Sequence, residues 1–261
     1  MKSLKLSVVL SLITALLVPA LSAASNAQVV AEDPDGGLVV RGGSTSGISS
    51  GDSLKQGDVV KSNGATLVVS ICDGALVTIY PNSEVAVSSL GSDVAVLNLI
   101  KGELLGDTIS GCSVSIANKA GTADISNGVY GVIMNQTGQG WTLQVRNLDG
   151  NVSFTGSPSL DTSNVTASIV NPGETTSVGA GEEITIRGTF DDNNNVFSLT
   201  AGGAVIAGLP DSAINRMSDR AKEMNAIDED AGDDAEGPPP GPPEFIDLPE
   251  QAETASDHGQ G

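Results

Sequence analysis

Histidine is almost absent from this 261-residue chain, whose only histidine, His258, lies near the end of the sequence. A Ser-His-Asp or Cys-His arrangement requires a histidine inside the folded domain, so both kinds of nucleophilic catalysis are excluded. A zinc site built from histidine and cysteine is excluded for the same reason. The sequence also has no glycine loop followed by lysine of the kind that binds phosphate.

Aromatic residues are scarce as well, at 3% of the sequence, and those that could stack against a sugar ring are Trp141, Tyr80 and Tyr130. Paired carboxylates for glycoside hydrolysis would have to come from a scattered set of acids. These acids are Asp58, Asp73, Glu103, Asp107 and Glu174. We therefore predict a protein that is not an enzyme and has no cofactor, with a polysaccharide-active enzyme as an alternative.

Basic residues are few: 12 Lys and Arg stand against 32 Asp and Glu, which gives a net charge of −20. Such a chain repels phosphate backbones and anionic membranes, so nucleic acid is excluded as a partner. Calcium or a basic partner remains open. Residues 191–195, Asp-Asp-Asn-Asn-Asn, offer oxygen ligands that suit calcium, but they lack the spacing of a known calcium loop. Asp/Asn clusters are also common in hairpin turns, and we predict a turn.

Long hydrophobic runs are also rare. One run, at residues 6–18, follows Lys2 and Lys5 and precedes small residues ending at Ala27. This order indicates a signal peptide at residues 1–27, too short to span a bilayer comfortably. We predict cleavage after Ala27, with Ala24 as the second choice and an uncleaved anchor as the alternative. The protein is then exported to the periplasm or beyond, with no membrane span after cleavage.

Two cysteines occur in the chain, Cys72 and Cys112. In an oxidising compartment they are expected to form one disulfide, with two buried free thiols as the alternative. The loop between them is about 40 residues long, for which the chain-entropy model gives roughly 4 kcal/mol of stabilisation.

Short apolar segments alternate with Gly, Asn, Asp or Pro from about Gly51 onward. This pattern predicts strands at residues 67–72, 76–80, 85–87 and 94–100, the last one ending at Lys101-Gly102. The first two are separated by Asp73-Gly74. We predict an all-β fold of many short strands, either a β-roll or solenoid or a β-sandwich.

Strict alternation is clearest at Trp141, Leu143 and Val145, which share one face of a strand. The following pair, Asp149-Gly150, predicts a tight hairpin turn before the next strand. Cys112, Val114 and Ile116 alternate in the same way, as do Ile184 and Ile186.

Composition divides the chain into segments. Residues 28–47 are predicted to be a flexible lead-in, 48–210 the β domain and 211–227 a short helix. The apolar stripe of this helix is predicted to dock on the domain, through Ile214, Met217, Ala221 and Met224. Residues 228–261 hold eleven acids, no Lys or Arg and a proline run, which predicts a disordered acidic tail. Within it Phe245, Ile246 and Leu248 form an apolar island that is a candidate partner-docking motif, with an inert tail as the alternative.

A series of short motifs occurs in order between residues 48 and 178. It includes Gly57-Asp58-Val59-Val60, the stretch from Asp73 to Ser83 with its Tyr80-Pro81-Asn82 turn, Lys101-Gly102-Glu103, and Asn171-Pro172-Gly173-Glu174. This series resembles the domain of the FecR family, the periplasmic part of bacterial regulators that relay iron–siderophore signals to a sigma factor. The resemblance implies a β fold and an extracytoplasmic setting.

The chain also departs from that family, whose regulators carry a cytoplasmic helical segment ahead of a membrane span. Here only the predicted signal peptide precedes the domain, so a contact with a cytoplasmic sigma factor is not expected. We predict an exported binding or scaffold module that engages an envelope or extracellular protein. The alternative is a soluble sensory or regulatory component of a cell-surface signalling system.

Overall fold

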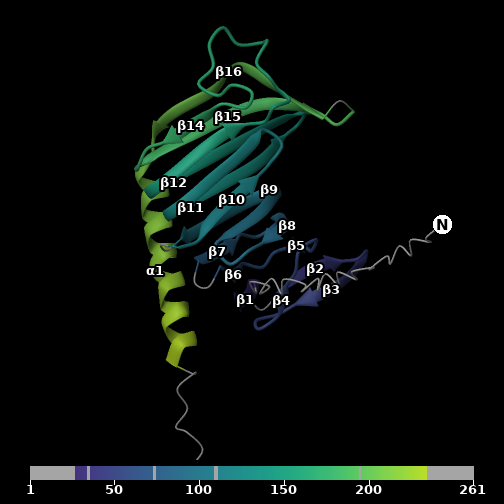
Figure 1. The fold of residues 1–261 in the computed structure, drawn as a ribbon, viewed down its shortest axis with the longest axis vertical. Coiled ribbons are helices and arrows are strands. Elements are labelled where there is room, and N and C mark those ends of the chain that lie inside the picture. Colours follow the sequence, from purple (N-terminus) through teal and green to yellow (C-terminus); the bar gives the residue numbers. More distant parts are fainter. Residues whose placement is uncertain (1–26, 34–35, 73–74, 109–110, 194, 234–261) are drawn as a thin grey trace, which may run out of the picture.

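The chain forms one curled β-sheet with a long helix against its outer side (Figure 1). The structure is a computed structural model, and it describes residues 27–33, 36–72, 75–108, 111–193 and 195–233. The predicted signal peptide, apart from Ala27, and the tail beyond residue 233 lie outside the described residues. The all-β prediction is confirmed.

Sixteen strands and one helix make up the described residues. The first eight strands are β1 Ala27–Glu32, β2 Gly37–Arg41, β3 Ser44–Ile48, β4 Ser53–Leu54, β5 Val59–Lys61, β6 Leu67–Ile71, β7 Ala75–Ile79 and β8 Glu84–Leu90. The other elements are β9 Val94–Thr108, β10 Ser113–Ala117, β11 Gly121–Thr137, β12 Gly140–Gly156, β13 Leu160–Asp161, β14 Thr175–Val178, β15 Glu182–Asp191, β16 Val196–Gly208 and α1 Asp211–Asp233.

All sixteen strands belong to a single hydrogen-bonded sheet. Its main path runs β13-β16-β15-β12-β11-β10-β9-β7-β6-β1-β4, and the sheet curls so that its inner face encloses one large apolar core. Leu99, Val132, Leu143 and Ile184 lie in this inner core, and none of the α1 side chains that the structure describes is part of it. Because the layers are continuous through shared strands, a β-roll describes the fold better than a sandwich of two separate sheets.

Residues 28–47, predicted as a flexible lead-in, instead form β1, β2 and β3, so that prediction is wrong. Strand β1 pairs with β4 and β6, and the β2–β3 hairpin pairs with β5. Val29 and Val39 are buried in the inner core. The β-branched runs around these valines supply the apolar face of a strand. The stabilisation from burying them outweighs the low strand propensity of the polar and glycine residues between them.

Two glycine pairs predicted to end strands lie inside long strands instead. Lys101-Gly102 falls within β9, where the pairing with β8 shifts register, and Asp149-Gly150 falls within β12 at a register shift against β11. Gly102 and Gly150 have φ of 95° and 124°, values that favour glycine. A bulge needs such a residue as much as a turn does, which is why the hairpin prediction at Asp149-Gly150 is wrong.

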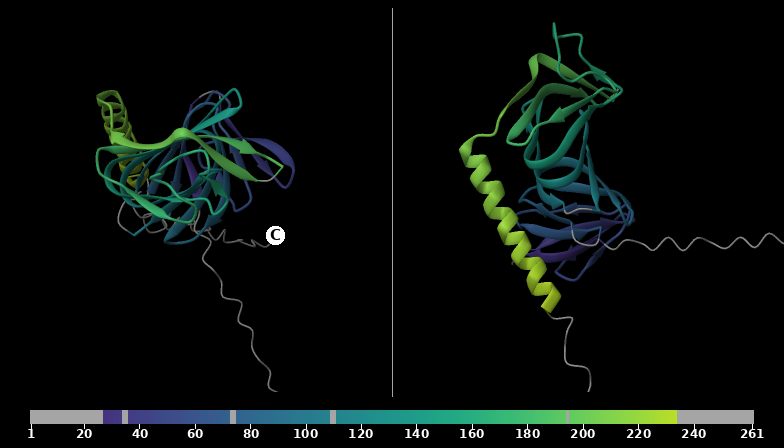
Figure 2. Two further views of the ribbon diagram at one scale, coloured as in Figure 1. Left: turned by 90° about the horizontal axis from the view of Figure 1, so that it is seen from above. Right: turned by 60° about the vertical axis from the view of Figure 1, so that its left-hand side comes forward.

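Helix α1 lies along the outer side of the sheet (Figure 2). Its stripe of Met217, Ala221 and Met224 is buried against an outer core that includes Leu105 and Val129, as the sequence predicted. Arg220 adds a polar anchor by donating from Nε to Oγ1 of the buried Thr78 on β7, at 2.9 Å. The helix is therefore packed against the sheet as part of the domain.

The helix is longer than predicted and continues from residue 228 to Asp233. The acids of this stretch predict a disordered tail, and that prediction is wrong for these six residues. Extending an existing helix adds one hydrogen bond for each residue that is fixed, so a docked helix can continue past its buried stripe.

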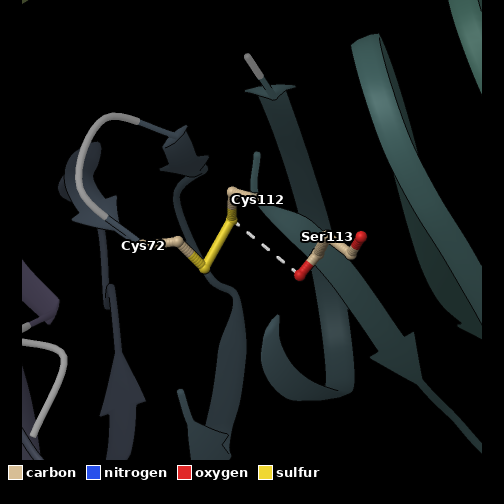
Figure 3. The surroundings of a disulfide bond; sticks show 3 residues. All are labelled: Cys72, Cys112 and Ser113. Atoms are coloured by element: carbon tan, nitrogen blue, oxygen red, sulfur yellow. Dashed lines mark hydrogen bonds between the residues drawn. A yellow bond between two sulfur atoms is a disulfide. The ribbon is translucent and has the colours of Figure 1, made fainter. Parts of the chain in front are cut away.

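Cys72 and Cys112 form the predicted disulfide, with their Cα atoms 5.7 Å apart (Figure 3). Cys72 follows β6 and Cys112 precedes β10, so the bond ties two strands that are not neighbours in the sheet. Both residues are buried in the inner core.

Asp58 holds the β2–β3 hairpin against the β4–β5 connection. Its carboxylate is 1% exposed and accepts hydrogen bonds from Arg41 Nε at 2.8 Å, from Arg41 Nη2 at 2.6 Å and from the Lys55 backbone N–H at 2.8 Å. The hydrogen bonds from Arg41 are the main reason why the pKa of Asp58 is lowered. The Asp58 carboxylate is therefore engaged in a structural ion pair with Arg41.

Replacing this carboxylate is expected to destabilise the fold. Asp58→Ala should lower the free energy of unfolding at pH 7 by about 2 kcal/mol, because hydrogen bonds to a buried charged group are lost. Since the folded pKa lies below the unfolded one, this stabilisation is present above about pH 4 and is lost as the pH falls through the folded pKa. Urea unfolding at pH 7 and at pH 2.5 should show the difference between wild type and variant shrinking in acid. The exposed Asp93→Ala serves as control, and an equal loss there would contradict the account.

Candidate functional site

The acids proposed for catalysis do not come together. Asp58 is engaged by Arg41, Glu103 forms an ion pair with Arg216, and Glu174 accepts from Asn171 Nδ2 at 2.9 Å. Asp107 lies four residues after Glu103 on β9, about 13 Å along an extended strand. That spacing exceeds the roughly 5–10 Å between the two carboxyl groups of a glycosidase. Asp73 lies outside the described residues.

Asp107 has a different role from the one that hydrolysis would need. It lies half-buried on the outer side of β9, and burial is the main reason why its pKa is raised, with the nearby Asp149 adding to the effect and Asn225 of α1 opposing it. The raised pKa comes from packing under the helix, so it does not by itself indicate a catalytic acid.

The candidate site that combines cations with aromatic rings and amides is a groove between α1 and the sheet, which we call the α1 groove. It has a volume of about 590 Å³. Its lining comes from residues 80–82, 101–103, 133–136, Trp141, Arg146 and Arg216. These residues come from the β7–β8 turn, from β9, β11 and β12, and from the first turns of the helix, which contributes Arg216.

Three cations meet in the α1 groove. Arg216 pairs with Glu103 and stacks over the Tyr80 ring, with its guanidinium carbon 5.0 Å from the ring centre. Arg146 donates from Nε to Glu183 at 2.9 Å. Lys101 is the freest of the three, with its side chain 57% exposed and its ammonium 4.0 Å from Glu84.

These cations keep donors for a ligand. Arg216 is 47% exposed, and a guanidinium has five N–H groups, of which the ion pair with Glu103 uses a part. The lining of the groove contains Glu103 as its one acid among the described residues, against three cations. Two further acids just outside the lining, Glu183 and Glu84, pair with Arg146 and Lys101.

A glycine and a serine fix the position of Glu103. The Ser83 hydroxyl accepts a hydrogen bond from the Glu103 N–H at 2.9 Å and donates to the Glu103 carbonyl at 3.2 Å. Gly102 lies directly against Ser83, and a Cβ at this position would collide with the serine side chain and backbone. The bulge at Gly102 therefore positions Glu103 at the groove, where Glu103 pairs with Arg216.

Two aromatic residues, Tyr80 and Trp141, line the groove. Tyr80 is half-buried, and burial is the main reason why its pKa is raised, so its hydroxyl stays neutral at physiological pH. Trp141 packs partly against the inner core, and Lys119 Nζ lies 4.3 Å from its ring centre and 4.1 Å from that of Phe190. One face of each groove aromatic is thus covered by a cation.

The third aromatic considered for sugar stacking, Tyr130, is fully buried in the inner core, where its hydroxyl lacks a hydrogen-bond partner among the described residues. Its pKa is raised by burial and by the charge of Asp107. The Tyr130 ring packs directly over Gly106, where a Cβ would collide with it. Tyr130 is therefore a packing residue.

A second hollow of about 430 Å³ lies over β10, β11, β12 and β14. It is lined mostly by serine and other small residues, and its one charged lining side chain, Asp124, accepts from the Ser115 hydroxyl at 2.6 Å. It has no aromatic side chain and no cation in its lining, so it offers less for selective binding than the α1 groove does.

The predicted turn at 191–195 joins β15 to β16, with Asp191 opposite Val196. Asp191 Oδ1 accepts from the Asn193 N–H at 2.9 Å, a local turn contact, and Asp192 lies 3.6 Å from Lys119. Across the described ranges, no group of three or more His, Cys, Asp or Glu side chains is arranged to hold a metal ion.

Several lining residues of the α1 groove are predicted from the sequence as motif or stacking residues, but the sequence does not predict that they lie together. The stretches 80–82 and 101–103 belong to the family motifs, and Trp141 is one of the predicted stacking residues. Arg146 and Arg216 belong to no predicted motif or site. A signal was present, since Arg146 is on the face of β12 opposite the apolar alternation and Arg216 flanks the buried Met217. Phe245, Ile246 and Leu248 lie outside the described residues.

In the part of the chain that the structure describes, no helix has the length and apolar character to cross a membrane. No family model and no curated protein matches the sequence. Two crystal structures provisionally named as an anti-sigma factor of Parabacteroides distasonis ATCC 8503 align with part of this structure. They show 14% and 13% identity, with TM-scores of 0.39 and 0.40. The aligned part covers 57% and 58% of this chain, and 58% and 59% of those chains, less than two thirds of their length.

Proposed function

We propose that the chain is an exported, non-enzymatic binding module whose α1 groove takes an acidic, extended segment of an envelope or extracellular protein. The observation that supports this most is the gathering of Lys101, Arg146 and Arg216 around one groove in a strongly acidic chain. The alternative of a soluble regulatory component stays a prediction, because both roles would use the same groove.

Export is proposed from two features. The predicted signal peptide directs the chain out of the cytoplasm, and the Cys72–Cys112 disulfide is compatible with an oxidising compartment. Export would also explain why a chain with two cysteines pairs them in its core.

The mature N-terminus is expected to be Ser25. Ala27 is 1% exposed and pairs with Leu54, so cleavage after Ala27 would remove a buried residue from β1, whereas cleavage after Ala24 would leave the strand complete. N-terminal sequencing of the exported protein tests this. A mature chain beginning at Gln28 would show that Ala27 is dispensable.

The charge distribution favours an acidic ligand despite the net charge of the whole protein. At physiological ionic strength the Debye length is about 8 Å, so distant acids are largely screened while a carboxylate inside the groove meets the arginines directly. Carboxylate–guanidinium hydrogen bonds are stronger than neutral ones and are often bidentate.

A peptide fits the groove better than a sugar does. Ile133 and the edges of Tyr80 and Trp141 supply apolar surface, while Asn135 and Gln136 carry amides that can both donate to and accept from a peptide backbone. Stacking of a sugar needs open aromatic faces, and a cation already covers one face of each ring.

The test is calorimetric titration of the mature protein with the acetylated peptide Gly-Glu-Phe-Glu-Gly-Glu-Phe-Glu-Gly, and with the same peptide carrying Gln in place of Glu. The acidic peptide should bind at least about 10-fold more tightly, because each charge-assisted hydrogen bond contributes about 1.5–3 kcal/mol. Equal affinity for the two peptides, or no binding of either, would contradict the proposal.

Arg216→Ala should weaken binding of the acidic peptide by about 10-fold and reduce its dependence on salt, because one exposed cation of the groove is removed. Lys222→Ala is the matched control, since Lys222 is an exposed cation of the same helix that pairs with Asp219 away from the groove. The same calorimetric titration measures both variants. If Lys222→Ala weakens binding as much as Arg216→Ala, the effect comes from overall charge and the groove is not the site.

A further inference from the structure

We infer that the α1 groove has a resident occupant within the same chain, the segment at residues 244–250, which would make the protein self-inhibited. This inference rests on the proposed function, because it assigns to the groove a ligand of the same chemistry. The segment, Glu-Phe-Ile-Asp-Leu-Pro-Glu, lies outside the described residues.

The segment has the composition that the groove favours. Residues 234–261 contain seven acids and no Lys or Arg, and three of these acids, Glu244, Asp247 and Glu250, flank an apolar island. The groove offers three cations to the acids and Ile133 with two aromatic edges to the island. The segment thus combines acidic and apolar side chains, and the lining of the groove combines cations and apolar groups.

The chain length allows the segment to return to the groove. Arg216 and Asp233 are 17 residues apart on α1, about 26 Å at 1.5 Å per helical residue. Residues 234–244 form a spacer of 11 residues with five prolines, which spans about 34 Å in the extended polyproline conformation. The spacer is therefore long enough to place Phe245 beside Arg216 if it runs back along the helix.

Attachment to the same chain favours this occupant over a free ligand. A short linker gives an effective concentration in the millimolar range, so an external acidic segment has to displace the tail. The tail then sets a threshold that selects tightly binding or abundant partners.

Photo-crosslinking tests the position of the tail directly. The mature full-length protein would carry benzoylphenylalanine at position 245, and mass spectrometry would locate the cross-links after irradiation. Cross-links within one chain to residues 80–82, 101–103, 133–136 or 216 are expected, and they should decrease in 1 M salt. Cross-links to the serine-lined hollow, cross-links between copies, or none at all would overturn the inference. The same photoreactive residue at position 256 is the matched control, with several-fold fewer groove cross-links expected.

A second experiment measures the inhibition in the full-length chain. The variant E244Q/F245A/D247N/L248A should bind the acidic probe peptide at least about 5-fold more tightly than wild type does. The control E253Q/D257N removes the same number of charges and should leave the affinity unchanged. Equal affinities in wild type and both variants would overturn the inference.

The two proposals fail in different ways. If the probe peptide binds wild type and the tail variant equally well and no groove cross-link forms, the binding function stands and self-inhibition falls. If neither protein binds the probe peptide although position 245 cross-links to the groove, the tail is a structural element and the proposed function falls.

Discussion

Replacing both disulfide cysteines, in the variant C72S/C112S, is expected to lower the free energy of unfolding by about 4 kcal/mol. The sequence separation of the two cysteines is 40 residues. In the chain-entropy model a cross-link of this span lowers the conformational entropy of the unfolded chain, which stabilises the folded state by about 4 kcal/mol. The bond also joins β6 to β10, which are not adjacent in the sheet, so no backbone ladder replaces it. Equilibrium urea unfolding monitored by circular dichroism measures the change.

Reduction of the wild-type protein provides the control. Wild type in a reducing buffer should unfold at the same urea concentration as the double variant does in either buffer, because both then lack the cross-link. A double variant as stable as oxidised wild type would contradict the assignment of a stabilising role to the bond.

Met217→Asp is expected to detach helix α1 from the sheet while leaving the β-roll folded. Met217 is 1% exposed in the outer core, and an unpaired carboxylate there costs several kcal/mol. The inner core contains none of the described side chains of α1, so the strands keep their packing. Hydrogen exchange should show fast exchange at residues 211–227 and unchanged protection in β9, β11 and β12.

The same variant should also lose binding of the acidic peptide, because Arg216 leaves the groove together with the helix. Asn215→Asp is the matched control, since it adds one negative charge at an exposed position of the same turn. Retained binding in Met217→Asp with a detached helix would show that the ligand site does not include α1.

The regular parts of the fold could be predicted because side-chain alternation is a direct record of burial. Leu143, Val145, Ile184 and Ile186 alternate with polar residues, and all four are buried in the inner core. The stripe on α1 follows the helical period and is buried as well. In each case the periodicity belongs to one element and needs no information from another.

The course of the long strands could not be predicted, because a glycine of positive φ serves turns and bulges equally. Lys101-Gly102 and Asp149-Gly150 look like strand ends in the sequence, yet β9 and β12 pass through them and change pairing there. A turn and a bulge are distinguished by whether the glycine lies opposite a neighbouring strand. At Gly128 and Gly150, for example, each glycine faces the backbone of the opposite strand so closely that a Cβ would collide with it.

The candidate site was hidden from the sequence for a similar reason. Tyr80, Lys101, Arg146 and Arg216 come from four separate elements and share no spacing that a linear motif could reveal. The register of β9, β11 and β12 and the docking of α1 bring them together. The cysteine pair, by contrast, was predictable because a chain with two cysteines has one possible intramolecular pairing.

The measurement that tests the binding proposal most directly is chemical-shift mapping of the ¹⁵N-labelled mature protein, titrated with the acidic peptide. Residues 80–82, 101–103, 133–136 and the first turns of α1 should shift with increasing peptide, and the Gln-substituted peptide should shift them far less. Shifts confined to the serine-lined hollow over β10–β12, or no saturable shifts, would contradict an anion-binding α1 groove.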